Sequence, residues 1–158
     1  MATEDVFIAS KGGVLRCEEL VLVAAGLAAG VYTASVTVPA GSHILDILVE
    51  GVALWNNGTS ATLKIGDATV DDGYYTGVNL KATDLLAGES LSFTAAGGKA
   101  GSYIANSQVS PRYSASDRVI AAIVTTVGSV PTTGSTRVLV IWAQSTAAHI
   151  SYASYVAT

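Results

Sequence analysis

Short apolar runs separated by turn residues fill the stretch from Ala61 to Phe93, and this pattern limits most strongly what the chain can fold into. Turn chemistry occurs at Gly66-Asp67, at Asp71-Asp72-Gly73 and at Ala87-Gly88. These turns leave room only for strands of about five or six residues. The stretch therefore predicts a β-sheet scaffold that contains almost no side chain suited to chemistry.

Longer apolar or alternating runs predict the main strands. Val31 to Val38 alternates apolar and polar residues, and Glu18 to Ala25 fits a short helix or a strand, of which we choose the strand. The runs Arg118 to Val127 and Thr136 to Gln144 are apolar on both faces, which is typical of strands that lie centrally in a sandwich or are half-buried by a neighbouring subunit. Further strands are expected at residues 44–49, 52–55, 62–65, 68–75, 90–94, 102–105 and 149–156.

The number and spacing of these runs indicate the fold class. About nine or ten strands with frequent turn signals are typical of an all-β protein. We predict a β-sandwich with a jelly-roll-like topology. Its buried core should include Val36, Ile47, Val49, Leu63, Ile65, Leu91, Phe93, Ile123, Val140 and Trp142.

Charge is scarce in this chain of 158 residues, of which 13% are charged and 50% hydrophobic. So few charges would cover an isolated monomer poorly, which predicts that part of the surface is buried against other subunits. The net charge of −4 comes without a basic stripe, so we expect no nucleic-acid partner.

The first residues differ from the rest of the chain. Residues 1 to 16 combine clustered charges with Gly12-Gly13 and one apolar triplet, Val6-Phe7-Ile8. We expect an extended N-terminal arm over residues 1–16, joined to a sandwich domain over residues 17–158. The triplet Val6, Phe7 and Ile8 has no place in the sandwich, so it is the candidate interface of the arm.

Residues 20 to 45 carry no Asp, Glu, Lys or Arg, and by length they could span a membrane. The second half of this segment is rich in Thr, Ser and β-branched residues and stops at Pro39-Ala40-Gly41, which favours two strands joined at Gly26 to Gly30. We therefore expect no membrane partner. The single cysteine and the start of the chain, which lacks a signal-peptide pattern, predict a protein made in a cytoplasm.

Residues suited to catalysis are few. The two histidines, His43 and His149, sit in no recognisable motif, and Cys17 has no companion cysteine for a metal site. The sequence contains no nucleophile elbow, phosphate-binding loop or zinc-binding helix motif. We predict a protein that is not an enzyme and has no catalytic residues, no cofactor and no metal.

Three carboxylates, Asp67, Asp71 and Asp72, lie close together before Gly73. They could supply oxygen ligands to calcium, but the spacing of the EF-hand loop is absent. Asp-Asp-Gly also suits a turn, because Asp side chains bind nearby backbone amides and Gly accepts a positive φ. We interpret the three residues as turn formers and keep calcium as the alternative.

Aromatic residues could form a platform for sugar rings, and they are equally suited to cores and interfaces. On a strand, Tyr74 and Tyr75 would point to opposite faces, so only one of them could join a given platform. The aromatic residues considered are Trp55, Tyr74, Tyr75, Tyr103, Tyr113, Trp142, Tyr152 and Tyr155.

A series of short motifs follows in order along residues 31–143. They are Val-Pro-Ala-Gly at 38–41, Val-Glu-Gly at 49–51, Trp55 before an Asn-Gly turn, Leu-Lys-Ile-Gly-Asp-Ala at 63–68, Asp-Asp-Gly-Tyr-Tyr at 71–75, Asp-Leu-Leu-Ala-Gly at 84–88 and Arg-Val-Leu-Val-Ile-Trp at 137–142. This order resembles small virion structural proteins of tailed bacteriophages, of the head-decoration or cement type.

The resemblance implies a β-sandwich or jelly roll that binds the outside of an assembled capsid, as a homotrimer, and stabilises the shell. The partners would then be the major capsid protein and other copies of the chain, and the location would be the capsid surface of the virion. No residue role is implied beyond the scaffold. The alternative is a receptor- or carbohydrate-binding sandwich module of a phage tail, a fibre or a surface protein.

Overall fold

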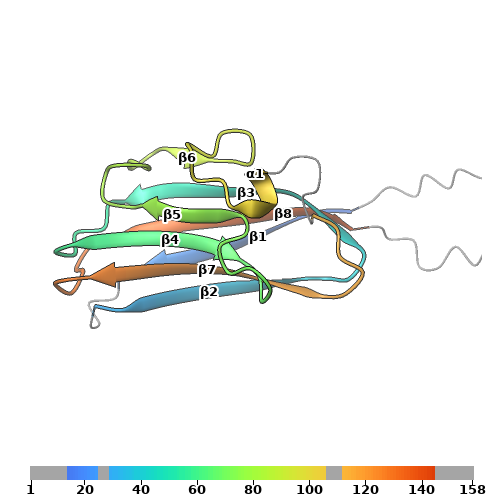
Figure 1. The fold of residues 1–158 in the computed structure, drawn as a ribbon, viewed down its shortest axis with the longest axis horizontal. Helices are drawn as coiled ribbons and strands as arrows, with labels where there is room; N and C mark the ends of the chain where they lie inside the picture. The colour runs from blue at the N-terminus through green and yellow to red at the C-terminus, as the bar shows by residue number, and fades with distance from the viewer. Residues whose placement is uncertain (1–13, 25–28, 106–111, 145–158) are drawn as a thin grey trace, which may run out of the picture.

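The computed structural model describes residues 14–24, 29–105 and 112–144, and these residues form two packed antiparallel sheets (Figure 1). The first sheet has the strand order β1-β8-β3-β6 and the second has the order β2-β7-β4-β5. The strands are β1 (Val14–Val23), β2 (Val31–Val38), β3 (Ser42–Ala53), β4 (Ser60–Gly66), β5 (Tyr75–Asn79), β6 (Ser90–Leu91), β7 (Arg118–Val127) and β8 (Ser135–Gln144), and one short helix, α1, covers Ser102–Ala105.

The strand pairing confirms the predicted all-β sandwich with jelly-roll topology. The antiparallel pairs are β1 with β8, β2 with β7, β3 with β6 and β4 with β5. Two further pairings, β3 with β8 and β4 with β7, join these pairs within each sheet. The chain is therefore a double ribbon of strands wrapped into two sheets, which is the jelly roll.

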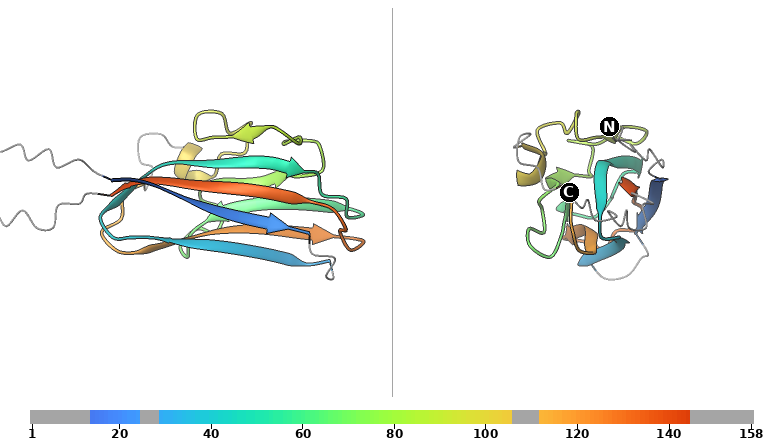
Figure 2. Two further views of the ribbon diagram at one scale, coloured as in Figure 1. Left: turned by 180° about the vertical axis from the view of Figure 1, so that it is seen from behind. Right: turned by 90° about the vertical axis from the view of Figure 1, so that its right-hand side faces the viewer.

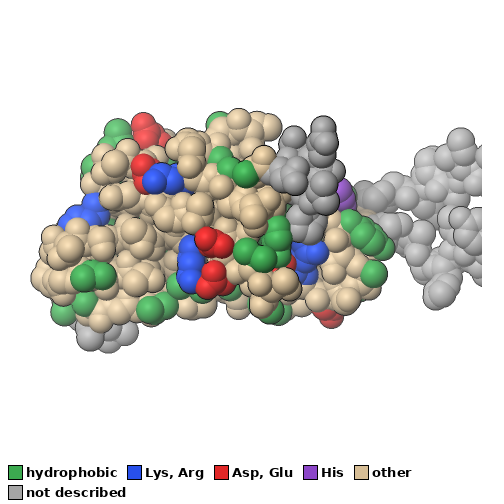
Figure 3. All heavy atoms as spheres, in the orientation of Figure 1, with side chains coloured by type: hydrophobic (Ala, Val, Ile, Leu, Met, Phe, Trp, Pro, Cys, Tyr) green, Lys and Arg blue, Asp and Glu red, His purple; other side chains and the backbone are tan. Residues whose placement is uncertain are grey.

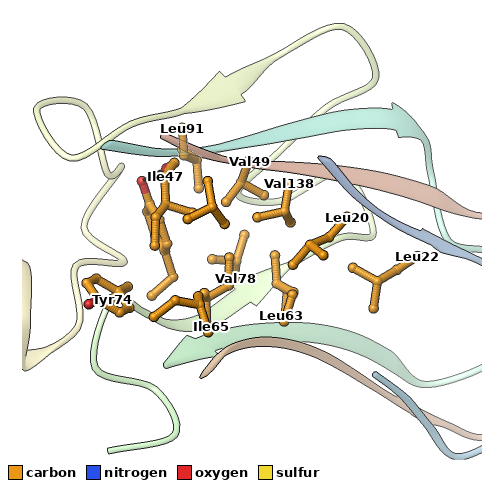
Figure 4. Close-up of a cluster of buried hydrophobic side chains, with 14 of the residues drawn as sticks. Leu20, Leu22, Ile47, Val49, Leu63, Ile65, Tyr74, Val78, Leu91 and Val138 are labelled. Atoms are coloured by element: carbon orange, nitrogen blue, oxygen red, sulfur yellow. Dashed lines mark hydrogen bonds between the residues drawn. The ribbon is translucent and has the colours of Figure 1, made fainter. Parts of the chain in front are cut away.

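The core lies between the sheets because the inward residues of each strand are apolar at every second position. In β7, Ile120, Ala122 and Val124 are buried, and in β8 the inward side chains Val138 and Val140 are buried as well. Figure 4 shows side chains of the first sheet pointing toward those of the second. The two runs that are apolar on both faces are thus the central strands of the two sheets, as the pattern predicted.

Most of the predicted core is confirmed. Val36 is only half-buried at the edge of the core, and Ile123 was wrongly placed there. Ile123 alternates with the buried Ala122 and Val124, so its side chain lies on the outer face of β7. The predicted residues that are buried are Ile47, Val49, Leu63, Ile65, Leu91, Phe93, Val140 and Trp142.

The strand boundaries differ from the predictions at several places. The expected strands at 44–49 and 52–55 form one strand, β3, whose register shifts between Ile44 and Asp46 and again between Gly51 and Ala53. Residues 68–74 form turns, so the strand expected there was wrong, and β5 starts at Tyr75. Residues 102–105, expected as a strand, form α1.

The start of the sandwich also differs from the expected boundary of the arm. β1 begins at Val14, inside the segment expected to be the arm, and pairs with β8 from that residue onward. Residues 20–23 and 31–38 are strand, in agreement with the predicted pair of strands. Residues 1–13 and the strand expected at 149–156 lie outside the described residues.

Candidate interaction surface

The outer face of the sheet β1-β8-β3-β6 carries rows of apolar side chains across its central strands. The strand register places Cys17 of β1 opposite Ile141 of β8. In the next row, Leu139 lies between Glu19 of β1 and Leu48 of β3. Figure 2 shows this sheet from its outer side, with β1, β8 and β3 side by side.

Several apolar side chains of this face are strongly exposed. Leu15 keeps 65% of its surface accessible, Val52 keeps 55% and Val21 keeps 51%. Leu139 and Ile141 are half-buried within the rows. Apolar side chains that lie together on a surface mark interaction sites in proteins, and on this face Leu139 neighbours Leu48 while Ile141 neighbours Cys17.

Carboxylates also lie in each of these rows, with Asp46 opposite Ile141, Glu19 opposite Leu139 and Glu50 opposite Arg137. Arg137 of β8 lies opposite Glu50 of β3 and Val21 of β1, and its guanidinium binds the Glu50 carboxylate through both Nε and Nη2. Glu19 lies 3.7 Å from the same guanidinium. The hydrogen bond and charge of Glu50 raise the pKa of Arg137, so this side chain stays positively charged. Two carboxylates therefore share one cation on this face.

A cleft of about 460 Å³ opens beside this ion pair, between β3 and the loop that precedes β6. The loop is attached to β3 at Gly51, whose N–H donates to Glu89 O at 3.0 Å and whose carbonyl accepts from Gly88 N at 2.7 Å. A Cβ at Gly51 would lie 2.3 Å from the Leu86 carbonyl oxygen, so only glycine allows this close approach. The walls of the cleft are thus backbone segments held in fixed positions.

The outer face of the other sheet, β2-β7-β4-β5, has a different character. On β2 the exposed side chains of this face are Val31, Thr33, Ser35 and Thr37, and on β7 the half-buried Ile123 and Thr125 lie between the exposed Val119 and Val127. Figure 3 shows the molecule from this side, and most of the surface is tan, the colour of backbone and of side chains that are neither apolar nor charged. This face combines hydroxyl groups with the exposed Val31, Val119 and Val127, whereas the opposite face places Leu139 and Ile141 beside an acidic cluster.

The carboxylate of Asp67 organises the turn that follows β4. Asp67 Oδ1 accepts hydrogen bonds from the backbone N–H groups of Thr69 and Val70, at 2.9 and 3.0 Å, and from the Tyr103 hydroxyl at 3.0 Å. Arg118 Nε lies 3.7 Å from Oδ2. Burial, followed by the hydrogen bond to Asp67, raises the pKa of Tyr103 to about 12. Asp67 is therefore a turn former, as predicted.

The other two carboxylates of this cluster have separate partners. Asp71 forms an ion pair with Lys64, and Asp72 Oδ2 accepts a hydrogen bond from Thr76 Oγ1 at 2.9 Å. Among the described residues, no group of three or more His, Cys, Asp and Glu side chains is placed to hold a metal ion. The structure thus does not bring the three carboxylates together.

The aromatic side chains considered for a sugar platform lie mainly in the core. Trp55 is 2% exposed and donates from Nε1 to Thr136 Oγ1 at 3.0 Å. Tyr75 is fully buried and donates its hydroxyl to the Ile47 carbonyl at 2.7 Å. Tyr74 is also fully buried and stacks on Phe93 with ring centroids 5.8 Å apart. Trp55, Tyr74 and Tyr75 therefore form no sugar platform, because none of them reaches the surface, whereas Tyr113 is 59% exposed.

The remaining candidates of the sequence lie apart from one another. His43 and Cys17 are exposed on β3 and β1. The predicted interface residues Val6, Phe7 and Ile8 lie outside the described residues, as do His149, Tyr152 and Tyr155. In the described part of the chain no helix is both long and apolar enough to cross a membrane.

The first and last described residues are neighbours. Val14, the first residue of β1, pairs with Gln144, the last residue of β8. Figures 1 and 2 show that both lie at the same end of the sandwich. The chain therefore enters β1 and leaves β8 at the same end of the sandwich.

Comparison with known proteins gives matches in structure only, since no family model and no curated protein matches the sequence. A chain of the cyanophage Pam1 capsid asymmetric unit superposes with a TM-score of 0.58 at 18% identity, over 92% of this chain and 98% of that chain. A chain of the acidic stable capsid structure of Helicobacter pylori bacteriophage KHP30 superposes with a TM-score of 0.55 at 15% identity, over 82% of this chain and 87% of that chain. At these identities the likeness shows only that the chains share a fold. Both matched chains are close to this one in length.

Proposed function

We propose that this chain is a non-enzymatic decoration protein of a tailed-phage capsid, which binds the outer surface of the head and stabilises the shell. The observation that carries the proposal is the match over nearly the whole chain to two small chains of phage capsid structures. The order of turn and strand motifs in the sequence pointed to the same class independently. Because a fold can host unrelated functions, the surfaces of this chain must supply the further support.

The surface chemistry agrees with a protein that works by assembly. The half-buried apolar side chains on the first sheet, around Leu139 and Ile141, provide contact area for a partner. Of the residues considered for a sugar or metal site, Trp55, Tyr74 and Tyr75 are used in the core and Asp67 is used in a turn. This weakens the alternative of a receptor- or carbohydrate-binding module.

Two finer features complete the proposal. The chain acts as a homotrimer, because closed cyclic symmetry lets identical subunits cover one patch of a shell. The N-terminal segment, with Val6, Phe7 and Ile8, docks outside its own sandwich, on a neighbouring copy or on the major capsid protein. Because Val14 pairs with Gln144, the N-terminal and C-terminal segments start from the same end of the sandwich, and both would contact the same neighbour.

Binding to heads tests the proposal directly. Empty, expanded heads would be prepared from the phage that encodes the chain, with the gene for this chain deleted. The purified chain should then co-sediment with the heads at saturating stoichiometry and raise the temperature at which they break. Heads that neither bind the chain nor gain stability would contradict the proposal, whereas retention on a glycan array would favour the alternative module.

A further inference from the structure

The outer face of the sheet β1-β8-β3-β6 is apolar and acidic, and no described segment packs over its central rows as a third layer. We propose that this face is the docking surface of the chain, and that its partner is a protein surface of apolar character that presents basic side chains. This inference rests on the proposed function and adds to it the face used and the chemistry of the surface bound. The outer face of the other sheet would then be turned away from the partner.

The apolar part of the contact lies on three adjacent strands. Leu139 has Leu48 beside it on β3, and Ile141 has Cys17 beside it on β1. Because these strands are hydrogen-bonded along their full length, the rows are held on a rigid support. Side chains held in this way lose little conformational freedom when a partner covers them, which favours binding.

The charged side chains of this face indicate the sign of the charge on the partner. Arg137 is the one cation that the register places among the outward residues of β8, and it binds Glu50 while Glu19 lies 3.7 Å away. Glu89 adds a third carboxylate at the cleft beside Glu50. Three carboxylates thus accompany one guanidinium, so the face is acidic and a basic partner would be attracted.

The same charges argue against a second copy of the chain as the occupant. Two such faces packed against each other would bring Glu19, Glu50 and Glu89 of both copies into one interface with only two Arg137 side chains. Like charges that are forced together on binding cost affinity. A partner with Lys or Arg on an apolar surface has no such conflict, and the cleft beside Glu50 has room for such a side chain.

A matched set of variants tests the inference through binding to empty heads. Leu139→Lys places a charge at the centre of the proposed face, and Ile123→Lys places the same charge on the outer face of β7. Ile123→Lys is the matched control for Leu139→Lys, since both residues are half-buried on an inner strand of a sheet. Val21→Lys, at a residue that is 51% exposed on the edge strand β1, repeats the test at a site where folding is little affected.

We expect Leu139→Lys and Val21→Lys to weaken head binding by at least about thirtyfold and about tenfold, while Ile123→Lys binds like the wild type. Leu139→Glu should lose less affinity than Leu139→Lys, because its charge attracts a basic partner. Wild-type binding should also weaken as salt is raised. Circular dichroism melting of each variant confirms that the sandwich is intact.

The possible failures can be told apart. If the wild type binds heads and both β1-β8 variants bind equally well, the docking face is wrong and the proposed function stands. If only Ile123→Lys loses binding, the opposite face is the docking surface. If Leu139→Glu loses as much affinity for heads as Leu139→Lys, the partner is not basic. If Leu139→Glu or Leu139→Lys turns an oligomer of the chain into monomers, the occupant of the face is a second copy. A wild type that binds no heads overturns the proposed function together with this inference.

Discussion

The outer face of the sheet β1-β8-β3-β6 carries Leu139 and Ile141 on β8 beside the carboxylates around Arg137, whereas the outer face of β2-β7-β4-β5 carries Ile123 between Ala121 and Thr125 on β7. Inside the sandwich the two sheets are alike, since their inward residues are mostly apolar and buried, with Thr126 and Thr136 as buried polar residues of β7 and β8. The requirement for a dry core fixes the inner faces of both sheets. The dry core does not constrain the residues of the outer faces. A difference in composition between the two outer faces therefore indicates that they have different surroundings.

The largest expected effect tests the shared part of this comparison, the core. Trp142→Ala in the first sheet should lower the free energy of unfolding by about 3–5 kcal/mol, and Ile65→Ala in the second by about 2–5 kcal/mol, because each truncation leaves a cavity. Urea denaturation measures both values. Thr125→Ala on an outer face is the control, with an expected change within about 0.5 kcal/mol. A loss confined to one sheet would show that the two inner faces are not equivalent.

The sequence predicted the inner faces better than the outer ones, and the reason is physical. The bounds of β2 and β7 follow from their patterns, because alternation and long apolar runs report burial against the core. The turn at residues 68–74 was missed because the hydrogen bonds of the Asp67 side chain outweigh the strand preference of the neighbouring apolar residues. Ile123 was misplaced because an apolar run does not say which of its faces is covered.

The same limit applies to the docking face. The run from Thr136 to Gln144 is apolar on both faces, which indicated burial by the sandwich or by a neighbouring subunit without separating the two. Only the register with β1 and β3 shows that Leu139 and Cys17 lie in adjacent rows with Glu19 and Arg137. A surface made by three strands that are distant in sequence leaves no contiguous motif.

The next largest effect concerns residues 1–13, which precede β1. Their removal should leave the circular dichroism spectrum unchanged and weaken head binding by at least about tenfold, because the triplet Val6-Phe7-Ile8 is lost and each bound copy loses one contact. Sedimentation with empty heads measures the loss. Binding at wild-type strength by the truncated chain would show that the sandwich docks without its first residues.

Oligomeric state sharpens the comparison of the two faces. Light scattering should find a mass about three times the 16.0 kDa of the chain. If the face around Leu139 is kept for another partner, Leu139→Lys should leave this mass unchanged. A mass of one chain at all micromolar concentrations would contradict the trimer in solution, and a trimer lost in Leu139→Lys would place self-association on that face.

A smaller effect is expected at alkaline pH, from the turn region next to the second sheet. The folded pKa of Tyr103 is raised to about 12, above the unfolded value of about 10, so the group stabilises the fold fully below pH 10 and loses this contribution as pH rises toward 12. Stability should therefore fall over that range. In Tyr103→Phe the decline should be shallower, and tyrosinate absorbance should show one group fewer titrating late. An identical decline of stability with pH in the wild type and in Tyr103→Phe would mean that folding does not raise the pKa of Tyr103.

The smallest expected effect is that of a chelator, and it tests whether the acidic turn of the second sheet is complete without an ion. Asp67 is occupied by two backbone N–H groups and the Tyr103 hydroxyl, and Asp71 is paired with Lys64. With these partners in place, EDTA should leave the melting temperature unchanged, and added calcium should not raise it. Asp67→Asn serves as the control, because it removes the charge near Arg118 and should lower the melting temperature with or without EDTA. A drop of several degrees in the wild type on adding EDTA, absent in Asp67→Asn, would assign these carboxylates to calcium and make the turn a ligand site instead of a structural one.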